Sequence, residues 1–139
     1  MSKERTLCIV KPDAVEKRKA GAIIQRLLDE GFEVLGLRQL QLTRRQAEGF
    51  YAVHRERGFF DELCTFMTRS PVVAIALQRD NAVQHLRNVI GATDPAKAAD
   101  GTVRKLFGSN VGENAVHGSD SADNGRIECA FYFPGMDLV

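Results

Sequence analysis

The segment Pro71-Val-Val-Ala-Ile-Ala-Leu77 is the clearest strand in this sequence of 139 residues. An unbroken apolar run of this length is typical of a strand that is buried on both faces of its sheet. The residues that follow predict a helix, because apolar side chains recur at helical spacing after Asp80, which can cap it, and stop at Gly91. The apolar residues on the inner face of this helix are Val83, Leu86, Val89 and Ile90.

The N-terminal part of the chain shows the same order of strand and helix. Residues 6–10 form a second, nearly continuous apolar run, and it stops at Lys11-Pro12-Asp13, where proline favours the start of a helix. That helix is expected to end at Gly31. Residues 33–42 then alternate like a strand, but the alternation changes phase. A bulge near Arg38-Gln39 would explain the change, as would a face shared with another subunit.

Two helical stretches and a last strand complete the predicted pattern. Thr43-Arg44-Arg45-Gln46 matches a capping box that opens a helix through roughly His54, and residues 60–69 form a second helical stretch. Residues 127–133 are expected to be the last strand. The order βαββαβ predicts an α+β, ferredoxin-like fold, in which helices cover one face of an antiparallel four-stranded sheet. We expect residues 1–139 to form a single domain.

Composition narrows the class of protein. The net charge of +1 argues against an obligate nucleic-acid partner. No apolar run approaches the roughly 20 residues that span a bilayer, and no signal peptide is apparent, so we expect a cytoplasmic protein without a membrane partner. An odd number of cysteines without CxxC spacing argues against disulfides and against a zinc site. We expect Cys8, Cys64 and Cys129 to be buried apolar side chains.

A polar, glycine-rich segment lies between Gly91 and Gly125. A stretch this long without regular structure is unusual in a small domain unless it is functional. It contains Asn114-Ala-Val-His117-Gly118-Ser119-Asp120, where a glycine beside the histidine lets a ligand approach the backbone. Glu128, inside the last apolar run, needs a partner; it can hold one ring nitrogen of His117 and leave the other as a nucleophile. Taken alone, His117 is more often a structural or surface histidine.

Three cations could complete an anion site with His117. Lys11 lies at the carboxyl end of the first strand, where ligands of α/β folds tend to bind. Arg87 lies at the edge of an apolar helix face, and Arg104 lies in the irregular segment. Each could also be an ordinary surface residue. Phosphoryl transfer mainly needs positioning and charge neutralisation, so this set would suffice with Mg²⁺ bridging the phosphates. The chain has no GxxxxGK[ST] loop, which excludes a P-loop mechanism.

These residues fall into motifs that resemble the nucleoside diphosphate kinase family. Asn114-x-x-His117-Gly118-Ser119-Asp120 looks like the active-site signature of that family, and Val10-Lys11-Pro12-Asp13-Ala14-Val15 resembles its first-strand motif. The resemblance covers essentially the entire chain. The remaining matches, in the order of the family, are Tyr51-x-x-His54, Arg57-x-Phe59-Phe60, Arg87, Gly91-x-Thr93-x-Pro95 and Gly101-Thr102-x-Arg104.

The resemblance implies a nucleoside diphosphate kinase with ping-pong kinetics. Such an enzyme moves the γ-phosphate of a nucleoside triphosphate, mainly ATP, to a nucleoside diphosphate through a phosphohistidine. His117 would attack through Nδ1, and Glu128 and Ser119 would orient it. Lys11 and Tyr51 would complete the catalytic set.

The resemblance also implies a nucleotide site and an assembly. The residues that would bind the nucleotide are Lys11, Phe59, Arg87, Thr93, Arg104 and Asn114. Phe59 would stack on the base, so the enzyme would barely discriminate among nucleobases. Mg²⁺ would be held mainly by the phosphates, with Asp120 reaching it through water. The chain would form a homo-oligomer, for which we favour a tetramer over a hexamer.

Two positions depart from the family pattern, and two rival functions stay open. Gly58 stands where the family usually has proline, which predicts weaker nucleotide binding. Asp123-Asn124-Gly125 is more turn-like than the helix expected there. A non-catalytic, nucleotide-binding regulatory protein of the same fold would be expected to lack His117 or Arg104. A ferredoxin-like RNA-binding module would need a basic surface and exposed aromatic residues on its strands.

Overall fold

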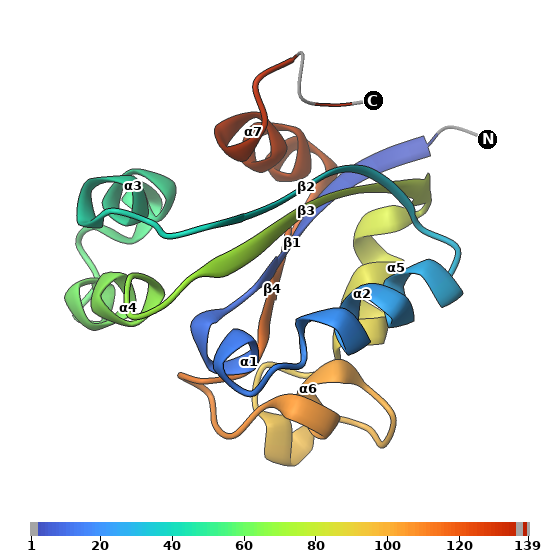
Figure 1. Cartoon of the computed structure of the whole chain (residues 1–139), viewed down its shortest axis with the longest axis horizontal. Helices are drawn as coiled ribbons and strands as arrows, with labels where there is room; N and C mark the ends of the chain where they lie inside the picture. Colours follow the sequence, from blue (N-terminus) through green and yellow to red (C-terminus); the bar gives the residue numbers. More distant parts are fainter. Residues whose placement is uncertain (1–2, 136–137, 139) are drawn as a thin grey trace.

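Four strands form a single antiparallel sheet in this computed structural model, which describes residues 3–135 and 138. The strands are β1 (Lys3–Val10), β2 (Glu33–Leu40), β3 (Val72–Asp80) and β4 (Val116–Gly118). Their order across the sheet is β2-β3-β1-β4, so the two most apolar strands, β1 and β3, lie at its centre (Figure 1). This is the strand order of the ferredoxin-like fold, and the predicted fold class is confirmed.

Helices lie on both faces of this sheet. Figure 1 shows α3, α4 and α7 on one side, and α2 and α5 on the other. The helices are α1 (Pro12–Glu16), α2 (Ala20–Asp29), α3 (Arg44–Phe50), α4 (Phe60–Met67), α5 (Ala82–Ile90), α6 (Val103–Phe107) and α7 (Ala122–Tyr132), with short 3-10 turns at Ala52–His54 and Pro95–Lys97.

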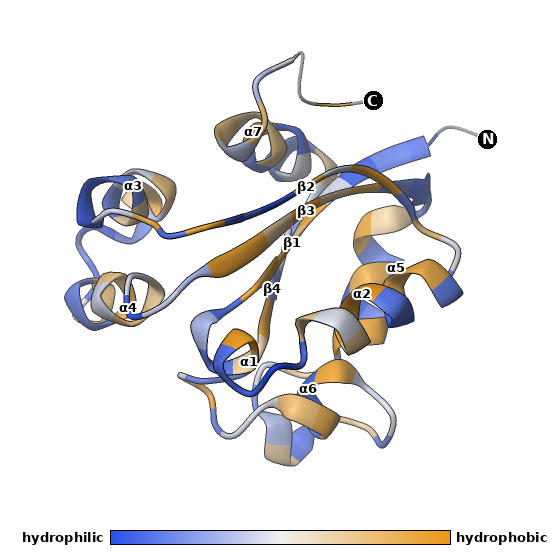
Figure 2. Cartoon of the chain, in the orientation of Figure 1, coloured by the Kyte–Doolittle hydropathy of each residue, from blue (hydrophilic) through white to orange (hydrophobic). Residues whose placement is uncertain are grey.

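Alternate residues of β1 point into two separate cores. Cys8 and Val10 pack with α1, α2 and α5, whereas Leu7 and Ile9 pack with α3, α4 and α7. Figure 2 shows the consequence in hydropathy, since the central strands are apolar along most of their length. The prediction that helices cover only one face of the sheet is therefore wrong in that detail. A strand buried on both faces needs a layer on each side.

The predicted last strand, residues 127–133, is also wrong, because these residues belong to α7 and its C-terminal end. The buried residues Gly125, Cys129 and Tyr132 recur at helical spacing, whereas Ile127 lies 67% exposed between them. Asp123-Asn124-Gly125 lies in the first turn of this helix and not in a separate turn. The fourth strand is instead β4, which runs antiparallel to β1 and places His117 opposite Ile9.

The segment between Gly91 and Gly125, predicted to lack regular structure, contains several short elements. They are the turn at Pro95–Lys97, α6, β4 and the start of α7. None of them is long enough to show a periodic pattern in the sequence. The segment is thus compact and supplies the strand that carries His117.

The irregularity of β2 lies closer to its start than predicted. Its register against β3 shifts between Val34 and Gly36, and the residues near Arg38 and Gln39 pair regularly. The strand also ends at Leu40. Its bulge thus lies beside Gly36, where an added Cβ would come 2.9 Å from the ring of Phe133.

Several predicted helix ends are confirmed, but the helix predicted from Pro12 to Gly31 is divided into α1 and α2, and α3 ends at Phe50 and not near His54. The Thr43 hydroxyl accepts the Gln46 N–H at 3.1 Å, and the Gln46 side chain accepts the Thr43 N–H at 2.9 Å, as a capping box requires. Gly31, with a φ of 85°, follows the end of α2. The predicted cap of α5 is wrong, because Asp80 ends β3 and Asn81, with a φ of 54°, lies at the cap without a side-chain hydrogen bond.

All three cysteines are free and buried, as predicted. Over the described residues, none of the helices combines the length and the apolar character that crossing a membrane requires.

Helix α7 approaches β1 so closely that Gly125 has no room for a side chain. A Cβ at this position would lie 2.2 Å from the backbone oxygen of Arg5. Gly125→Ala should therefore lower the free energy of unfolding by about 3 kcal/mol, although alanine is the better helix former. Urea denaturation followed by circular dichroism measures this loss.

Gly21→Ala is the matched control for this prediction. Gly21 also lies in a helix, and an added Cβ there meets no atom within 4 Å. The control should raise stability by roughly 0.5 kcal/mol through helix propensity alone. Equal effects of the two substitutions would show that α7 does not pack on β1 in this way.

Candidate active site

His117 lies in the middle of β4, with its ring held by a glutamate from α7. The ring Nε2 is 2.8 Å from Oε1 of Glu128, and the Ser119 hydroxyl donates to the same oxygen at 2.7 Å. Ser119 is itself fixed, because its Oγ accepts the Leu7 N–H of β1 at 3.0 Å. A carboxylate on Nε2 favours the tautomer that carries its proton there and leaves the Nδ1 lone pair available.

An aromatic side chain that the sequence did not single out packs against this ring. Phe50, at the end of α3, meets His117 edge to face, with ring centroids 5.6 Å apart. It also contacts Tyr51 and Tyr132. Phe50 therefore limits the rotation of the His117 ring through packing alone, without a charged group. In the sequence, it is an ordinary apolar residue of a helix.

Lys11 reaches the site from the carboxyl end of β1. Its Nζ donates to Oδ1 of Asn114 at 2.9 Å. Burial, together with the positive charge of Arg104, lowers the pKa of Lys11 to about 8, whereas Asp13 acts in the opposite direction. The amine is thus poised to change charge in the physiological range unless an anion binds to it.

Arg104 is fixed by backbone carbonyls. Its guanidinium donates to the oxygens of Asn114 at 3.3 Å, Gly91 at 3.1 Å and Val116 at 2.9 Å. Burial lowers the pKa of this group. The carbonyls hold the guanidinium in place without neutralising its charge, so it remains available to an anion.

Arg87, Thr93 and Arg104 line one pocket of about 440 Å³, which also borders Gly118, the neighbour of His117. Asn114 is buried beside it and donates from Nδ2 to the Thr93 carbonyl at 3.0 Å. The structure therefore brings together most of the predicted cations and polar groups around β4.

Two further predicted residues lie in an aromatic row that is linked to His117 through Phe50. Phe59 is 48% exposed and leans on the ring of His54, at a centroid distance of 5.5 Å. His54 in turn stacks on Tyr51 at 6.5 Å. Tyr51 is buried, its hydroxyl has no hydrogen-bond partner among the described residues, and burial raises its pKa well above the ordinary value. Phe59 thus offers an open ring face, and Tyr51 a protonated hydroxyl.

The protein offers few ligands to a metal ion here. Within residues 3–135 and 138, no group of three or more histidine, cysteine or acidic side chains could hold one. Asp120 is exposed near His117, and its Oδ1 accepts from Asn124 at 2.6 Å. One exposed carboxylate fits an ion that arrives with its own oxygen ligands, as Mg²⁺ does on nucleotide phosphates.

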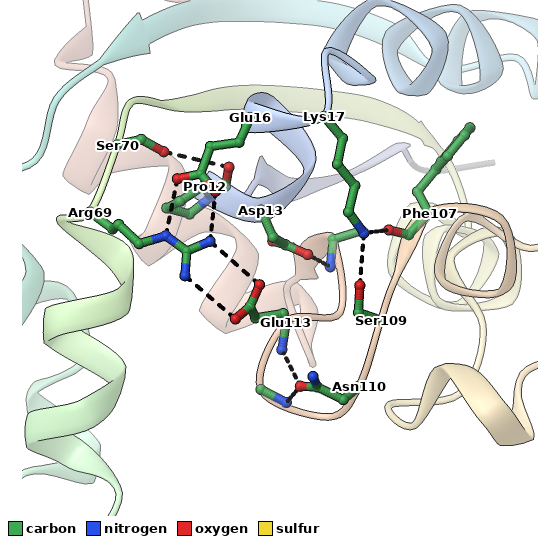
Figure 3. A network of polar contacts seen from close by, with 12 residues as sticks. Pro12, Asp13, Glu16, Lys17, Arg69, Ser70, Phe107, Ser109, Asn110 and Glu113 are labelled. Atoms are coloured by element: carbon green, nitrogen blue, oxygen red, sulfur yellow. Dashed lines mark hydrogen bonds and ion pairs between the residues drawn. The ribbon is translucent and has the colours of Figure 1, made fainter.

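A polar network that the sequence did not predict links α1 and Arg69 to the loop that precedes His117 (Figure 3). Arg69 bonds to both carboxylate oxygens of Glu16 in α1, at 2.7 and 3.0 Å, and reaches Glu113 in the loop at 3.4 Å. Asp13 accepts the backbone N–H of Ala115 at 3.0 Å. The partners are far apart in sequence, so no local pattern indicates them.

Comparisons with known proteins agree with this geometry. A sequence model described as nucleoside diphosphate kinase matches residues 4–138. Among similar curated proteins, the nucleoside diphosphate kinase of Sorangium cellulosum is 61% identical, and the match covers 100% of this chain and 96% of the relative. That of Persephonella marina is 49% identical, with 100% and 99% covered.

Solved structures match as well. The nucleoside diphosphate kinase of Aquifex aeolicus has a TM-score of 0.97 at 44% identity, over 99% of this chain and 100% of its own. A halophilic nucleoside diphosphate kinase from Halobacterium salinarum in complex with CDP has a TM-score of 0.94 at 36% identity, over 99% and 92%. Matches of this quality over nearly every residue mean that the chain belongs to the nucleoside diphosphate kinase family.

Proposed function

We propose that His117 carries the phosphoryl group between nucleotides in this nucleoside diphosphate kinase. The observation that supports this role most directly is the hydrogen bond of 2.8 Å between Glu128 and Nε2 of His117. It leaves Nδ1 as the nucleophilic nitrogen, and Ser119 on the same carboxylate oxygen keeps Glu128 in place.

The reaction proceeds in two matched halves. Nδ1 attacks the γ-phosphorus of a nucleoside triphosphate, mainly ATP; the N–P bond forms, the bond to the bridging oxygen breaks, and a nucleoside diphosphate leaves. Glu128 stabilises the positive charge that develops on the ring. A terminal phosphate oxygen of a second nucleoside diphosphate then attacks the phosphorus and releases His117. Because both nucleotides use one site in turn, the kinetics are ping-pong.

The cations neutralise the charge on the transferred group. Lys11, Arg87 and Arg104 would face the phosphate oxygens, where fixed positive charge lowers the barrier most. Thr93 would donate to a phosphate, and Asn114 with Lys11 would hold the sugar hydroxyls. The buried hydroxyl of Tyr51 would lie close to the phosphates.

Mg²⁺ fits this site as part of the nucleotide complex. When bound, it would neutralise part of the negative charge on the phosphates. Asp120 would hold it through water, as the exposed carboxylate nearest to His117 in sequence.

Phe59 would receive the base on its exposed face. Stacking needs only the π-face that every base has, so the enzyme would discriminate little among bases. The related halobacterial structure contains CDP, which supports a nucleotide as the ligand of this site.

We also propose the setting in which the enzyme works. The family match over residues 4–138 supports a single domain across residues 1–139. An unpaired strand edge favours pairing with another chain, so the edge strand β2, which exposes Leu37 by 46%, is consistent with a homo-oligomer, for which we favour a tetramer over a hexamer. Three free cysteines fit the reducing cytoplasm.

The phosphohistidine is tested by labelling with γ-labelled ATP. The wild-type protein should acquire an acid-labile, base-stable label, which GDP or CDP should remove. His117→Ala should acquire none. His85→Ala is the matched control, because His85 pairs with Glu30 away from the site and should keep its label. A protein that binds nucleotide without acquiring label would be the non-catalytic regulator.

The role of Phe59 is tested with Phe59→Ala. Loss of one stacking partner costs roughly 1–3 kcal/mol of binding free energy. KM should therefore rise about tenfold or more for ADP, GDP and CDP alike. Steady-state assays with each acceptor measure the change. A rise confined to one base would mean that edge hydrogen bonds, and not stacking, read the base.

The pH dependence should follow Lys11. Its pKa is about 8 in the free enzyme, so the ammonium form dominates below pH 8 and disappears above it. kcat/KM should therefore fall as the pH rises through about 8. In Lys11→Arg, this fall should move to a much higher pH, because guanidinium keeps its proton.

Lys3→Gln serves as control for this pH profile, since Lys3 pairs with Glu33 at the surface. Its profile should match that of the wild type. If the fall near pH 8 persisted unchanged in Lys11→Arg, the titrating group would be another one.

A further inference from the structure

The chain makes an unusually tight turn at Ala115, directly before the strand that carries His117. Ala115 has a φ of 75°, and the Val116 N–H donates to the Asn114 carbonyl at 2.9 Å. A hydrogen bond across one residue with a positive φ defines a γ-turn of the rare, strained kind. Ala115 is neither glycine nor asparagine, and it is fully buried, so the surrounding structure must hold this conformation.

Several groups of the phosphotransfer site depend on the shape of this turn. Arg104 donates to the carbonyls on both sides of Ala115, those of Asn114 and Val116. The side chain of Asn114 accepts from Lys11. His117 follows two residues later. If the turn relaxed to an ordinary conformation, these groups would move relative to one another.

The turn is held through both polar groups of Ala115. Its carbonyl accepts the Lys11 N–H at 2.8 Å, and its N–H donates to Oδ2 of Asp13 at 3.0 Å. Figure 3 shows the Asp13 carboxylate pointing at this N–H from α1. The first contact needs no particular side chain, whereas the second requires an acceptor at position 13.

Besides this bond, the charge of Asp13 favours the protonated form of Lys11, and its carboxylate makes no other direct polar contact among the described residues. Asp13 is 2% exposed, makes no ion pair among the described residues, and its Oδ1 has no hydrogen-bond partner there. Burying a carboxylate with one oxygen unsatisfied is unfavourable. Among the described residues, the bond to the Ala115 N–H is the one hydrogen bond that the Asp13 carboxylate makes.

We propose that Asp13 is a positioning residue for phosphoryl transfer, which fixes the strained turn at Ala115 and thereby places His117, Asn114 and Arg104 around the nucleotide phosphates. This inference rests on the proposed role of His117. Asp13 acts through the backbone and touches neither the nucleotide nor the phosphorus.

Three variants test the inference by the rate at which γ-labelled ATP phosphorylates His117. Asp13→Ala removes the acceptor and should slow labelling roughly 100-fold, as expected for misplacement by about 1 Å. Asp13→Asn keeps an oxygen for the Ala115 N–H and should stay within about fivefold of the wild type. The double variant Asp13→Ala with Ala115→Gly should be labelled at least about tenfold faster than Asp13→Ala alone, because glycine adopts a positive φ without strain.

Glu113→Gln is the matched control. It removes a negative charge from the same loop and weakens the exposed contact of 3.4 Å to Arg69, and it leaves Ala115 untouched. Its labelling rate should equal that of the wild type. All rates are compared at a temperature at which circular dichroism shows each variant to be folded.

The inference is overturned if Asp13→Ala labels as fast as Glu113→Gln, or if Ala115→Gly restores nothing. If Asp13→Ala does not fold, Asp13→Asn and the double variant decide: a loss in Asp13→Asn as large as 100-fold overturns the inference. Failure of the proposed function looks different, since the wild-type protein itself would then acquire no label.

Discussion

The structure depends on β1 being enclosed on all sides. It pairs with β3 on one edge along its whole length and with β4 on the other. Its side chains enter two different cores, and those from Leu7 to Val10 are fully buried. Two neighbours of β1 carry part of the site: β4 carries His117 and α7 carries Glu128. Lys11 directly follows the last residue of β1 itself. The geometry of the site is therefore set by how closely these neighbours pack on one strand.

The sequence predicted the fold where one element was long and its pattern unambiguous. The continuous apolar runs of β1 and β3 and the helical spacing of α2 and α5 led to the correct fold class. The same apolar runs already indicated that helices must cover both faces of the sheet. The predicted fold, with helices on one face only, did not take this into account. The region from 127 to 133 was misread because a short apolar run bearing one carboxylate suits a strand and a half-buried helix equally well. Strand β4 spans only Val116–Gly118 and has no periodicity to detect.

The candidate site was predicted better than the elements that carry it. The approach of Glu128 to His117 was expected, yet it occurs from a helix and not from a strand. A carboxylate in an apolar run needs a partner on either element, so the pairing did not depend on the assignment. Phe50 and Asp13 could not be assigned in this way. The contacts of Phe50 arise from packing between α3 and β4, and that of Asp13 from a backbone N–H whose orientation depends on the folded turn.

The close contact at Gly125 also limits how the site could change. Glu128 follows it by about one helical turn, so the distance from α7 to β1 sets the gap that its side chain must bridge to reach His117. The helix backbone already touches the strand at Gly125, with space for a hydrogen atom and no more. A shorter acid at position 128 could not be accommodated by moving the helix inward. The choice of glutamate over aspartate is thus imposed by steric contact at a residue that has no side chain.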